Sequence, residues 1–293
     1  MELRVLRYYC SVVNEGSISD AAKAMHVTQP TLSRQLAQLE SELGRTLFTR
    51  GRNGIELTPQ GVILYRYANN IIELADKAEE EVAMPAQSVA GTVHIGAGET
   101  KAFALIARAC ARVRKQYPRV DFELHDAPAA DLMDNFVRGY YDFLLDCDSA
   151  ENSDFNQLIL PIYDIWGVLM RQDDPLAHLD VIGPKDLVGR SVIASPQGTK
   201  RAFGRWAGPA LERIEVVATY SLPLNARHFV AERLGVMLTY GGLVDTVREA
   251  DGLCFRALSP RLEAHHKVLW RKTIPTKPAQ ALLDALQDVC QGK

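Results

Sequence analysis

The chain has 293 residues, which is enough for one small domain and one larger domain. Its 47% hydrophobic content is ordinary for a globular protein, no run of 18 apolar residues predicts a membrane span, and the N-terminus enters a helical pattern without a signal peptide. The net charge of −3 excludes binding of nucleic acid by bulk positive charge, and five scattered cysteines argue against a disulfide framework and predict a reducing cytoplasm.

Three short helices are predicted within the first 44 residues. The first carries an apolar stripe at helical spacing, made of Leu3, Leu6, Cys10 and Val13. Cys10 lies in this stripe and is therefore interpreted as a small buried residue rather than a reactive thiol. The second helix begins after Ser17, a good N-cap, and runs to about Met25.

The third helix has one apolar face and one polar face. Thr28 is its N-cap candidate, Pro30 lies in its first turn and Gly44 ends it. The apolar stripe consists of Leu32, Leu36, Leu39 and Leu43. The opposite face carries short or planar hydrogen-bonding groups, namely Gln29, Thr31, Ser33, Arg34, Gln35 and Gln38. Such groups suit base edges and phosphates, although the helix by itself is equally consistent with an amphipathic surface helix.

A basic β-hairpin is predicted directly after this helix, at residues 47–57, around an Arg-Gly-Arg-Asn-Gly turn. The turn between the second and third helices is short enough for a helix-turn-helix. Together these features predict a winged helix-turn-helix, whose third helix enters the major groove and whose wing contacts the DNA backbone. The predicted DNA contacts are Thr28, Gln29, Pro30, Thr31, Ser33, Arg34, Gln35, Gln38, Arg50 and Arg52.

The segment AAKAMHVTQPTLSRQLAQLESELGRTLFTR, followed by LTPQG, resembles the N-terminal domain of the LysR-type transcriptional regulators. The resemblance is dense from about Leu3 to Tyr67 and is far more specific than a generic helix-turn-helix. It implies a DNA-binding regulator with a ligand-sensing C-terminal domain.

A long helix is predicted from Thr58-Pro59 to about Met84, because Thr is a good N-cap and Pro suits the first helical turn. A heptad seam runs along it, made of Leu64, Ala68, Ile71, Ala75, Ala78 and Val82. We interpret the seam as a dimer contact, and packing of the helix on its own domain is the alternative. Residues 85–90 are the predicted hinge.

The remainder alternates strands and helices, which predicts parallel sheets. Predicted strands cover residues 92–96, 120–125, 141–146, 166–170, 191–194, 214–221, 236–239 and 266–270. Predicted helices cover residues 101–117, 130–138, from about 200, 224–234 and 279–290. The fold class is therefore multidomain, α followed by α/β: a winged helix-turn-helix at 1–58, a linker helix and hinge at 59–90, and a two-lobed domain at 91–293 like that of periplasmic binding proteins. Lobe I is expected at about 91–161 and 266–293, and lobe II at about 162–265.

An effector cleft is expected between the lobes, because ligands of open α/β sheets bind beyond the carboxyl ends of strands, often at helix N-termini. The resemblance implies the same positions. The candidate residues are Gly98, Glu99, Thr100, Lys101, Ala127, Pro128, Asp146, Ser195, Pro196, Thr199, Arg201, Tyr240 and Gly241. Thr100, Ser195 and Thr199 are the preferred hydroxyl donors, and helix capping is the alternative role of Thr100 and Thr199. Lys101 or Arg201 could pair with an effector carboxylate. Asp142, Asp146 and Asp148 could instead favour a cation or could be solvated, so the effector charge stays open.

Neither a metal site nor catalytic chemistry is predicted. His265 and His266 alternate across a strand, whereas His94 and His125 are isolated. Cys147 ends a strand, but no second cysteine lies nearby in the sequence to form a redox pair. No catalytic triad and no full dinucleotide fingerprint is present.

The sequence thus predicts a cytoplasmic, non-enzymatic, sequence-specific DNA-binding regulator without a cofactor, controlled by a small-molecule effector. Its expected partners are double-stranded DNA carrying an inverted repeat, the effector, and further copies of the chain as a dimer or a dimer of dimers. RNA polymerase is a further candidate partner, and no membrane is expected. The alternative is a solute-binding protein or metabolic enzyme with a vestigial helix-turn-helix.

Overall fold

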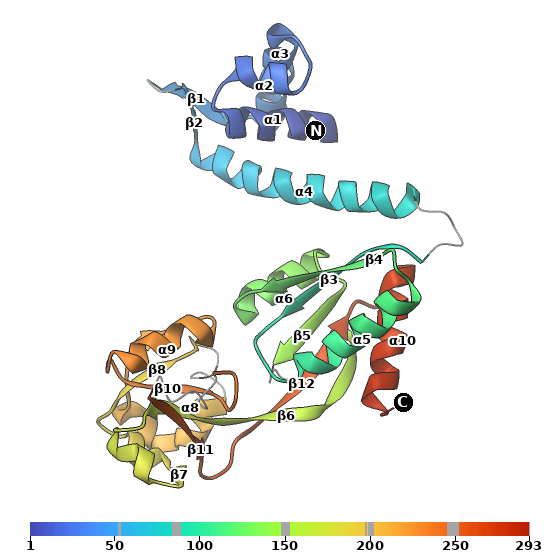
Figure 1. Cartoon of the computed structure of the whole chain (residues 1–293). Helices are drawn as coiled ribbons and strands as arrows, with labels where there is room; N and C mark the ends of the chain where they lie inside the picture. Colours follow the sequence, from blue (N-terminus) through green and yellow to red (C-terminus); the bar gives the residue numbers. More distant parts are fainter. Residues whose placement is uncertain are drawn as a thin grey trace. The chain divides into compact units, whose positions relative to one another are not determined.

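The computed structural model describes residues 1–51, 54–83, 89–147, 153–196, 198, 202–244 and 252–292. The chain forms two units, Met1–Ala86 and Gln87–Lys293 (Figure 1). Among the described residues, no helix combines the length and the apolar character that crossing a membrane requires.

The first unit is a winged helix-turn-helix followed by a long helix. Its elements are α1 (Leu3–Glu15), α2 (Ile18–Ala24), α3 (Gln29–Leu43), β1 (Phe48–Gly51), β2 (Gly54–Leu57) and α4 (Pro59–Ala83). The three predicted short helices, the hairpin and the long helix are all present. Gly16 and Gly44 end α1 and α3 with φ of 69° and 62°, a conformation that glycine adopts without steric cost.

The predicted N-cap residues Ser17 and Thr28 both occupy the N-cap positions of their helices, but only Ser17 makes a side-chain capping bond. The Ser17 hydroxyl accepts a hydrogen bond from the Asp20 N–H at 3.0 Å and so satisfies an unpaired donor of the first turn. Thr28 occupies the N-cap position of α3, but its side chain makes no capping bond. Its hydroxyl instead lies 2.8 Å from that of Thr31.

The core of this unit forms where α1, α3, the wing and the start of α4 meet. Leu32, Leu36 and Leu39 are at most 1% exposed, whereas Leu43 is 42% exposed and lies outside the core. Cys10 is buried as predicted, and burial raises its pKa to about 11, which makes it a poor thiolate.

The second unit has two α/β lobes. Lobe I contains β3 (Gly91–Ala97), α5 (Phe103–Gln116), β4 (Val120–Asp126), α6 (Ala129–Arg138), β5 (Phe143–Cys147), β12 (Glu263–Trp270) and α10 (Lys277–Cys290). Strand β3 pairs in parallel with β4 and β5, and β12 pairs antiparallel with β5. Helices α5 and α10 lie side by side and cover one face of this sheet, whose buried residues they share (Figure 1).

Lobe II contains the remaining elements. These are η1 (Pro175–His178), β7 (Val181–Ile182), η2 (Pro184–Leu187), β8 (Ser191–Ala194), α8 (Ala202–Ala207), η3 (Gly208–Arg213), β9 (Glu215–Thr219), α9 (Pro223–Ala231), β10 (Val236–Tyr240) and β11 (Leu253–Leu258). The central strands β10, β8 and β9 run parallel to one another. Most of the predicted elements are present, but β11 was not predicted.

The strand β6 (Asn156–Arg171) joins the lobes (Figure 1). It pairs with β12 in lobe I and with β10 and β11 in lobe II, all antiparallel. The sequence analysis expected a strand only at 166–170 and a lobe boundary at residue 162, which falls inside β6. Residues of β6 between 156 and 165 pair with β12 of lobe I, and residues 166–171 pair with β10 and β11 of lobe II, so the chain passes between the lobes close to the expected boundary, and β12 provides the return crossing.

Candidate functional site

The polar face of α3 is available to a partner molecule. Buried leucines hold the opposite face against the core, so the helix has a fixed rotation. The side chains of Thr28, Gln29, Pro30, Arg34 and Gln38 are exposed, and those of Thr31, Ser33 and Gln35 are half-buried. Gln38 donates to Glu42 at 3.1 Å. The predicted contact residues of α3 therefore occupy the part of its surface that the buried leucines leave accessible, where they can donate to and accept from a nucleic acid.

The wing is anchored beside this face. Strands β1 and β2 pair antiparallel from Phe48–Leu57 to Gly51–Gly54. The Ile55 N–H donates to the carbonyl of Gly16 at 3.1 Å, which ties the hairpin to the corner between α1 and α2. A Cβ at Gly54 would lie 2.7 Å from that same carbonyl oxygen, so the close approach requires glycine. Arg50 lies in β1, and Arg52 lies outside the described residues.

A cleft with a volume of about 370 Å³ lies between the two lobes of the second unit. Lobe I contributes the ends of β3 and β5 and the start of α6, and lobe II contributes the ends of β8 and β10 and the start of α9. These are the carboxyl ends of strands and the amino ends of helices, where small ligands bind in open α/β sheets.

Six of the predicted effector residues line the cleft: Gly98, Glu99, Ala127, Asp146, Ser195 and Tyr240. Five others are not among its lining residues: Thr100, Lys101, Pro128, Pro196 and Gly241. Thr199 and Arg201 lie outside the described residues.

Several of the predicted effector residues that do not line the cleft instead contribute to helix capping, turn hydrogen bonds or buried contacts nearby. Pro128 is the N-cap of α6. The Gly241 N–H donates to the Ile165 carbonyl at 2.9 Å, and a Cβ at Gly242 would lie 2.4 Å from Nζ of Lys101. Thr100 is 7% exposed and is committed to a buried cluster, so it is not the cleft hydroxyl that the sequence analysis preferred.

That cluster connects lobe I with the strands that cross between the lobes. The Thr100 hydroxyl donates to Oδ2 of Asp164 at 2.5 Å, and Nε2 of His266 lies 3.1 Å from the same oxygen. Asp164 and His266 are at most 2% exposed. Burial acts to raise the pKa of Asp164, but hydrogen bonds from His266 and Thr100 outweigh it and hold the pKa below the usual range. The cluster fixes the start of α5 to β6 and β12.

Sequence reasoning missed several cleft residues that come from distant segments. They include Met133, Asp134, Trp166, Tyr220 and Thr239. Trp166 is 5% exposed, and no described residue pairs with its Nε1, so a ligand could accept this hydrogen bond. Tyr220 donates to the Leu238 carbonyl at 2.6 Å, and burial raises its pKa to about 12. The strand-end rule finds the loops that follow strands, but Trp166 projects from within β6 and carries no such signal.

The acidic groups of the cleft differ in their surroundings. Burial, together with the nearby carboxylate of Asp126, raises the pKa of Glu99. Asp146 is 7% exposed and lies 3.7 Å from Nζ of Lys267, so it is a buried ion-paired residue rather than a solvated strand end. Asp142 instead accepts from the His94 N–H at 2.9 Å, and Asp148 lies outside the described residues.

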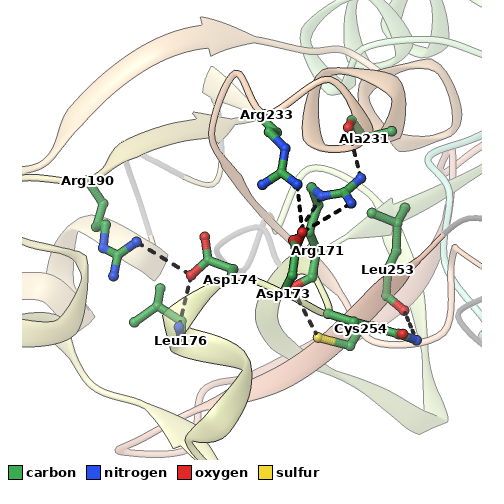
Figure 2. Close-up of polar contacts among 10 residues, drawn as sticks. Arg171, Asp173, Asp174, Leu176, Arg190, Ala231, Arg233, Leu253 and Cys254 are labelled. Atoms are coloured by element: carbon green, nitrogen blue, oxygen red, sulfur yellow. Dashed lines mark hydrogen bonds and ion pairs between the residues drawn. The ribbon is translucent and has the colours of Figure 1, made fainter.

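A second hollow, of about 200 Å³, lies in lobe II, and Figure 2 shows the polar contacts among several residues that line it. Its three arginines each contact a carboxylate: Arg171 and Arg233 both donate to Asp173, and Arg190 lies 3.4 Å from Asp174. Hydrogen bonds from Arg171 and then Arg233 lower the pKa of Asp173 to about 2. Because carboxylates already hold these guanidinium groups, we interpret the contacts around this hollow as a structural network.

The five cysteines lie in different parts of the fold and are all free thiols in this structure. None of the five described cysteines forms a disulfide. Cys147 lines the cleft, and its Sγ would lie 3.3 Å from a Cβ at Gly98. Burial raises the pKa of Cys110 to about 12, and it also raises the pKa values of Cys254 and Cys290.

Comparison with known proteins connects both units to one family. Residues 3–62 match the family described as bacterial regulatory helix-turn-helix protein, lysR family, and residues 86–291 match the LysR substrate binding domain. A hydrogen peroxide-inducible genes activator of Pectobacterium carotovorum subsp. carotovorum is 24% identical over 298 residues, covering 100% of this chain and 98% of that protein. The nitrogen assimilation regulatory protein nac of Klebsiella aerogenes is 31% identical over 193 residues, covering 66% of this chain and 59% of that protein.

Solved structures of full-length regulators show the same fold. CbnR complexed with its target DNA gives a TM-score of 0.73 at 16% identity, covering 99% of this chain and 100% of that chain. HinK from Pseudomonas aeruginosa gives a TM-score of 0.55 at 22% identity, covering 99% of each chain. With its DNA-binding and substrate-binding domains both matched, the chain belongs to the LysR family of bacterial helix-turn-helix transcriptional regulators.

Proposed function

We propose that this regulator binds an interrupted inverted repeat of double-stranded DNA as a dimer, and that a small molecule in the inter-lobe cleft changes its DNA binding. The observation that carries the proposal is the fixed, solvent-facing polar surface of α3 beside an anchored wing. One copy presents one such surface, so recognition of two half-sites requires two copies.

In this account the residues of α3 that contact DNA are Gln29, Thr31, Ser33, Arg34, Gln35 and Gln38, with Thr28 and Pro30 at the helix start. Arg34 is exposed and planar, so it can donate two hydrogen bonds to a guanine or a phosphate. The wing arginines Arg50 and Arg52 contact the backbone and supply affinity without sequence preference.

The apolar surface of α4 supports dimer formation. Ala68 is buried in the core of its own domain and Leu64 packs against that core, so the first part of the predicted seam faces inward, as the alternative interpretation had it. An exposed apolar stripe runs beside it at helical spacing: Ile63, Tyr67, Ile71, Leu74 and Val82, which are 36–86% exposed. Burial of this stripe against a second copy would remove it from water, which is favourable.

The effector is proposed to lie against Glu99, Ser195, Trp166 and Tyr240, which the cleft brings together from both lobes. These groups offer a carboxylate, a hydroxyl, an indole N–H and an aromatic ring. A ligand that contacts both lobes would favour one inter-lobe angle, which is the means by which it could alter the DNA-binding state. The protein is proposed to act in the cytoplasm and not as an enzyme, with RNA polymerase as a further candidate partner.

Selection of bound fragments from sheared genomic DNA tests the proposal. The purified full-length chain is expected to enrich fragments that share an interrupted inverted repeat. Enrichment of fragments without a common motif would reject sequence-specific recognition. A shared motif containing only one half-site would reject the dimeric arrangement while keeping the DNA-binding function.

A further inference from the structure

Two histidines that are far apart in the sequence meet a glutamate on the sheet of lobe I. Strands β3 and β4 run parallel with His94 opposite Glu123 and Gly96 opposite His125. Side chains two residues apart on a strand share one face, so Glu123 and His125 project on the same side. His94 joins them across the pair, which corrects the interpretation of both histidines as isolated.

The distances within this trio suit a shared metal ion. Nδ1 of His94 lies 3.4 Å from Oε2 of Glu123, and Nε2 of His125 lies 3.3 Å from Oε1 of the same residue. One ligand atom from each residue lies within 4.8 Å of the other two. Charge-assisted hydrogen bonds are shorter, about 2.7–2.9 Å. A tetrahedral ion with bonds of about 2.0–2.2 Å holds its ligand atoms roughly 3.3–3.6 Å apart, so each imidazole nitrogen already lies near that spacing from the carboxylate, although the two nitrogens face different oxygens of Glu123.

Neighbouring contacts hold the ligands in place. Asp142 accepts from the backbone N–H of His94 at 2.9 Å and donates its own N–H to the His94 carbonyl at 2.8 Å, which fixes this point of β3. The His125 ring packs on Tyr141 with centroids 5.0 Å apart. A Cβ at Gly96 would lie 2.5 Å from the Tyr141 ring, so glycine lets that ring support His125.

Solvent can reach the trio. The side chains of His94, His125 and Glu123 are 20%, 33% and 54% exposed, so an ion can enter and a water can complete its coordination. The three residues do not line the effector cleft, but Gly98 and Ala127, a few residues further along β3 and β4, do. An ion joining the two strands would therefore stiffen the supports of the cleft without occupying it.

We propose that His94, Glu123 and His125 form a binding site for a divalent transition-metal ion of the Zn²⁺ class. Two imidazole nitrogens and one carboxylate are donors that Zn²⁺ accepts with three protein ligands and an open fourth position. Mg²⁺ and Ca²⁺ prefer oxygen-only sites and do not compete for such donors. The site does not depend on the proposed DNA or effector binding.

Metal titration of the tag-free full-length protein tests this site. The chelator-treated protein is titrated with ZnCl₂ in competition with a chromophoric zinc chelator, under reducing conditions, with MgCl₂ as the control ion. We expect one tight Zn²⁺ per chain. His94→Ala and His125→Ala should each weaken that binding by at least about 100-fold, because each removes a direct ligand. Glu123→Gln should weaken it as well, and Mg²⁺ should not displace Zn²⁺.

A matched control separates this trio from an ordinary histidine on the surface. His265→Ala removes an exposed histidine that lies 3.5 Å from Glu263, a His–Glu pair to which no other described residue adds a third ligand. It should leave Zn²⁺ binding unchanged. Equal Zn²⁺ affinity in the wild type, His94→Ala and His125→Ala would overturn the proposal, as would the absence of a tight site in the wild type.

Cobalt spectra distinguish this site from binding by cysteine. Co²⁺ at two imidazoles and a carboxylate gives visible ligand-field bands without a thiolate charge-transfer band. We expect such bands in the wild type and their loss in His125→Ala and in Glu123→Gln, whose replaced side chain is half exposed and carries little folding risk. A thiolate charge-transfer band in the wild type, or unchanged bands in both variants, would place the ion elsewhere and overturn the proposal.

Discussion

At the scale of single residues, the most specific prediction concerns the contribution of Arg34 to DNA affinity. Its side chain is exposed on α3, while Leu36 beside it is buried and keeps the helix rotation fixed. We expect Arg34→Ala to weaken binding to the preferred DNA by about 1–3 kcal/mol, because a bidentate contact with a base edge is lost. Fluorescence anisotropy with a selected DNA fragment measures this change.

Arg4→Ala is the matched control for that measurement. Arg4 is also exposed, but it lies in α1 beside Glu2, outside α3 and the wing. It should leave the affinity within a few tenths of a kcal/mol of the wild type. Equal losses in the two variants would show that general charge, rather than Arg34 itself, determines the binding.

Glu99 gives a pH-dependent expectation. Its folded-state pKa is raised, mainly by burial, so its contribution favours folding below the ordinary pKa of glutamate and is lost as the pH rises through the raised value. At neutral pH the buried, ionised carboxylate of Glu99 destabilises the folded state, and Glu99→Gln removes that charge. We expect the variant to unfold at a higher temperature than the wild type at pH 7, with the difference shrinking as the pH falls below the ordinary glutamate pKa.

Thermal unfolding of Glu212→Gln provides the comparison, because Glu212 is exposed on η3. The unfolding temperature of Glu212→Gln should equal that of the wild type at each pH. A Glu99→Gln variant that is less stable than the wild type at pH 7 would mean that the carboxylate has a stabilising partner, contrary to this account.

The sequence predicted several cleft residues at strand ends but missed others, among them Met133 within α6 and Trp166 within β6. Gly98, Glu99 and Ala127 were found because a strand and then a helix mark their positions. Thr100 satisfies the same pattern, yet Asp164 on β6 takes its hydroxyl. A local pattern cannot reveal such a partner, because it arrives through tertiary packing.

The trio on lobe I was missed for a similar reason. The spacing of His94 and His125 along the chain carries no ligand signature. Only the parallel register of β3 and β4 brings them together. Register depends on how whole strands pack, so it was not available from residue spacing.

At the scale of elements, the ion pairs of Asp173 tie the end of β6 to the end of α9. Arg171 belongs to β6, and Arg233 follows α9 (Figure 2). The pKa of Asp173 is lowered to about 2, so its stabilising contribution is present above the ordinary aspartate pKa and is lost as the pH falls towards about 2. We expect Asp173→Asn to lower the unfolding temperature at pH 7, and the gap from the wild type to narrow below about pH 4.

Asp180→Asn is the control for that series, because Asp180 is exposed in the same lobe. Its unfolding temperature should match the wild type throughout. If the unfolding temperatures of Asp173→Asn and the wild type differed by the same amount at every pH, the assigned role of the carboxylate charge would be contradicted.

The elements themselves were largely predictable from periodicity and caps. Helices α1 to α4 and the wing follow from apolar spacing, Ser17, Pro59 and the glycines. The full extent of β6 was not predictable from residue spacing, because its first half is identified as a strand by its pairing with β12. Strand β11 also depends on its partners, since β6 and β7 flank it.

At the scale of the whole molecule, we expect the proposed dimer to form through the exposed stripe of α4. Ile71 is 39% exposed at the middle of that stripe. We expect Ile71→Glu to shift the chain from dimer to monomer, because two buried charges would face each other across the helix pair. Sedimentation or light scattering across a concentration series measures the change.

Ile274→Glu is the matched control, because Ile274 is 96% exposed and lies between β12 and α10. The control should keep the wild-type mass. A dimeric Ile71→Glu variant would show that the stripe is not the main interface.

The most direct test of the account is a DNase footprint of the full-length protein on the DNA upstream of its own gene, over a salt series. We predict protection of an interrupted inverted repeat by the wild type, weakening as salt rises, and no protection by Arg34→Ala at protein concentrations where the wild type protects fully. Uniform protection without a repeat, or an identical footprint for Arg34→Ala, would contradict the claim that α3 reads DNA sequence.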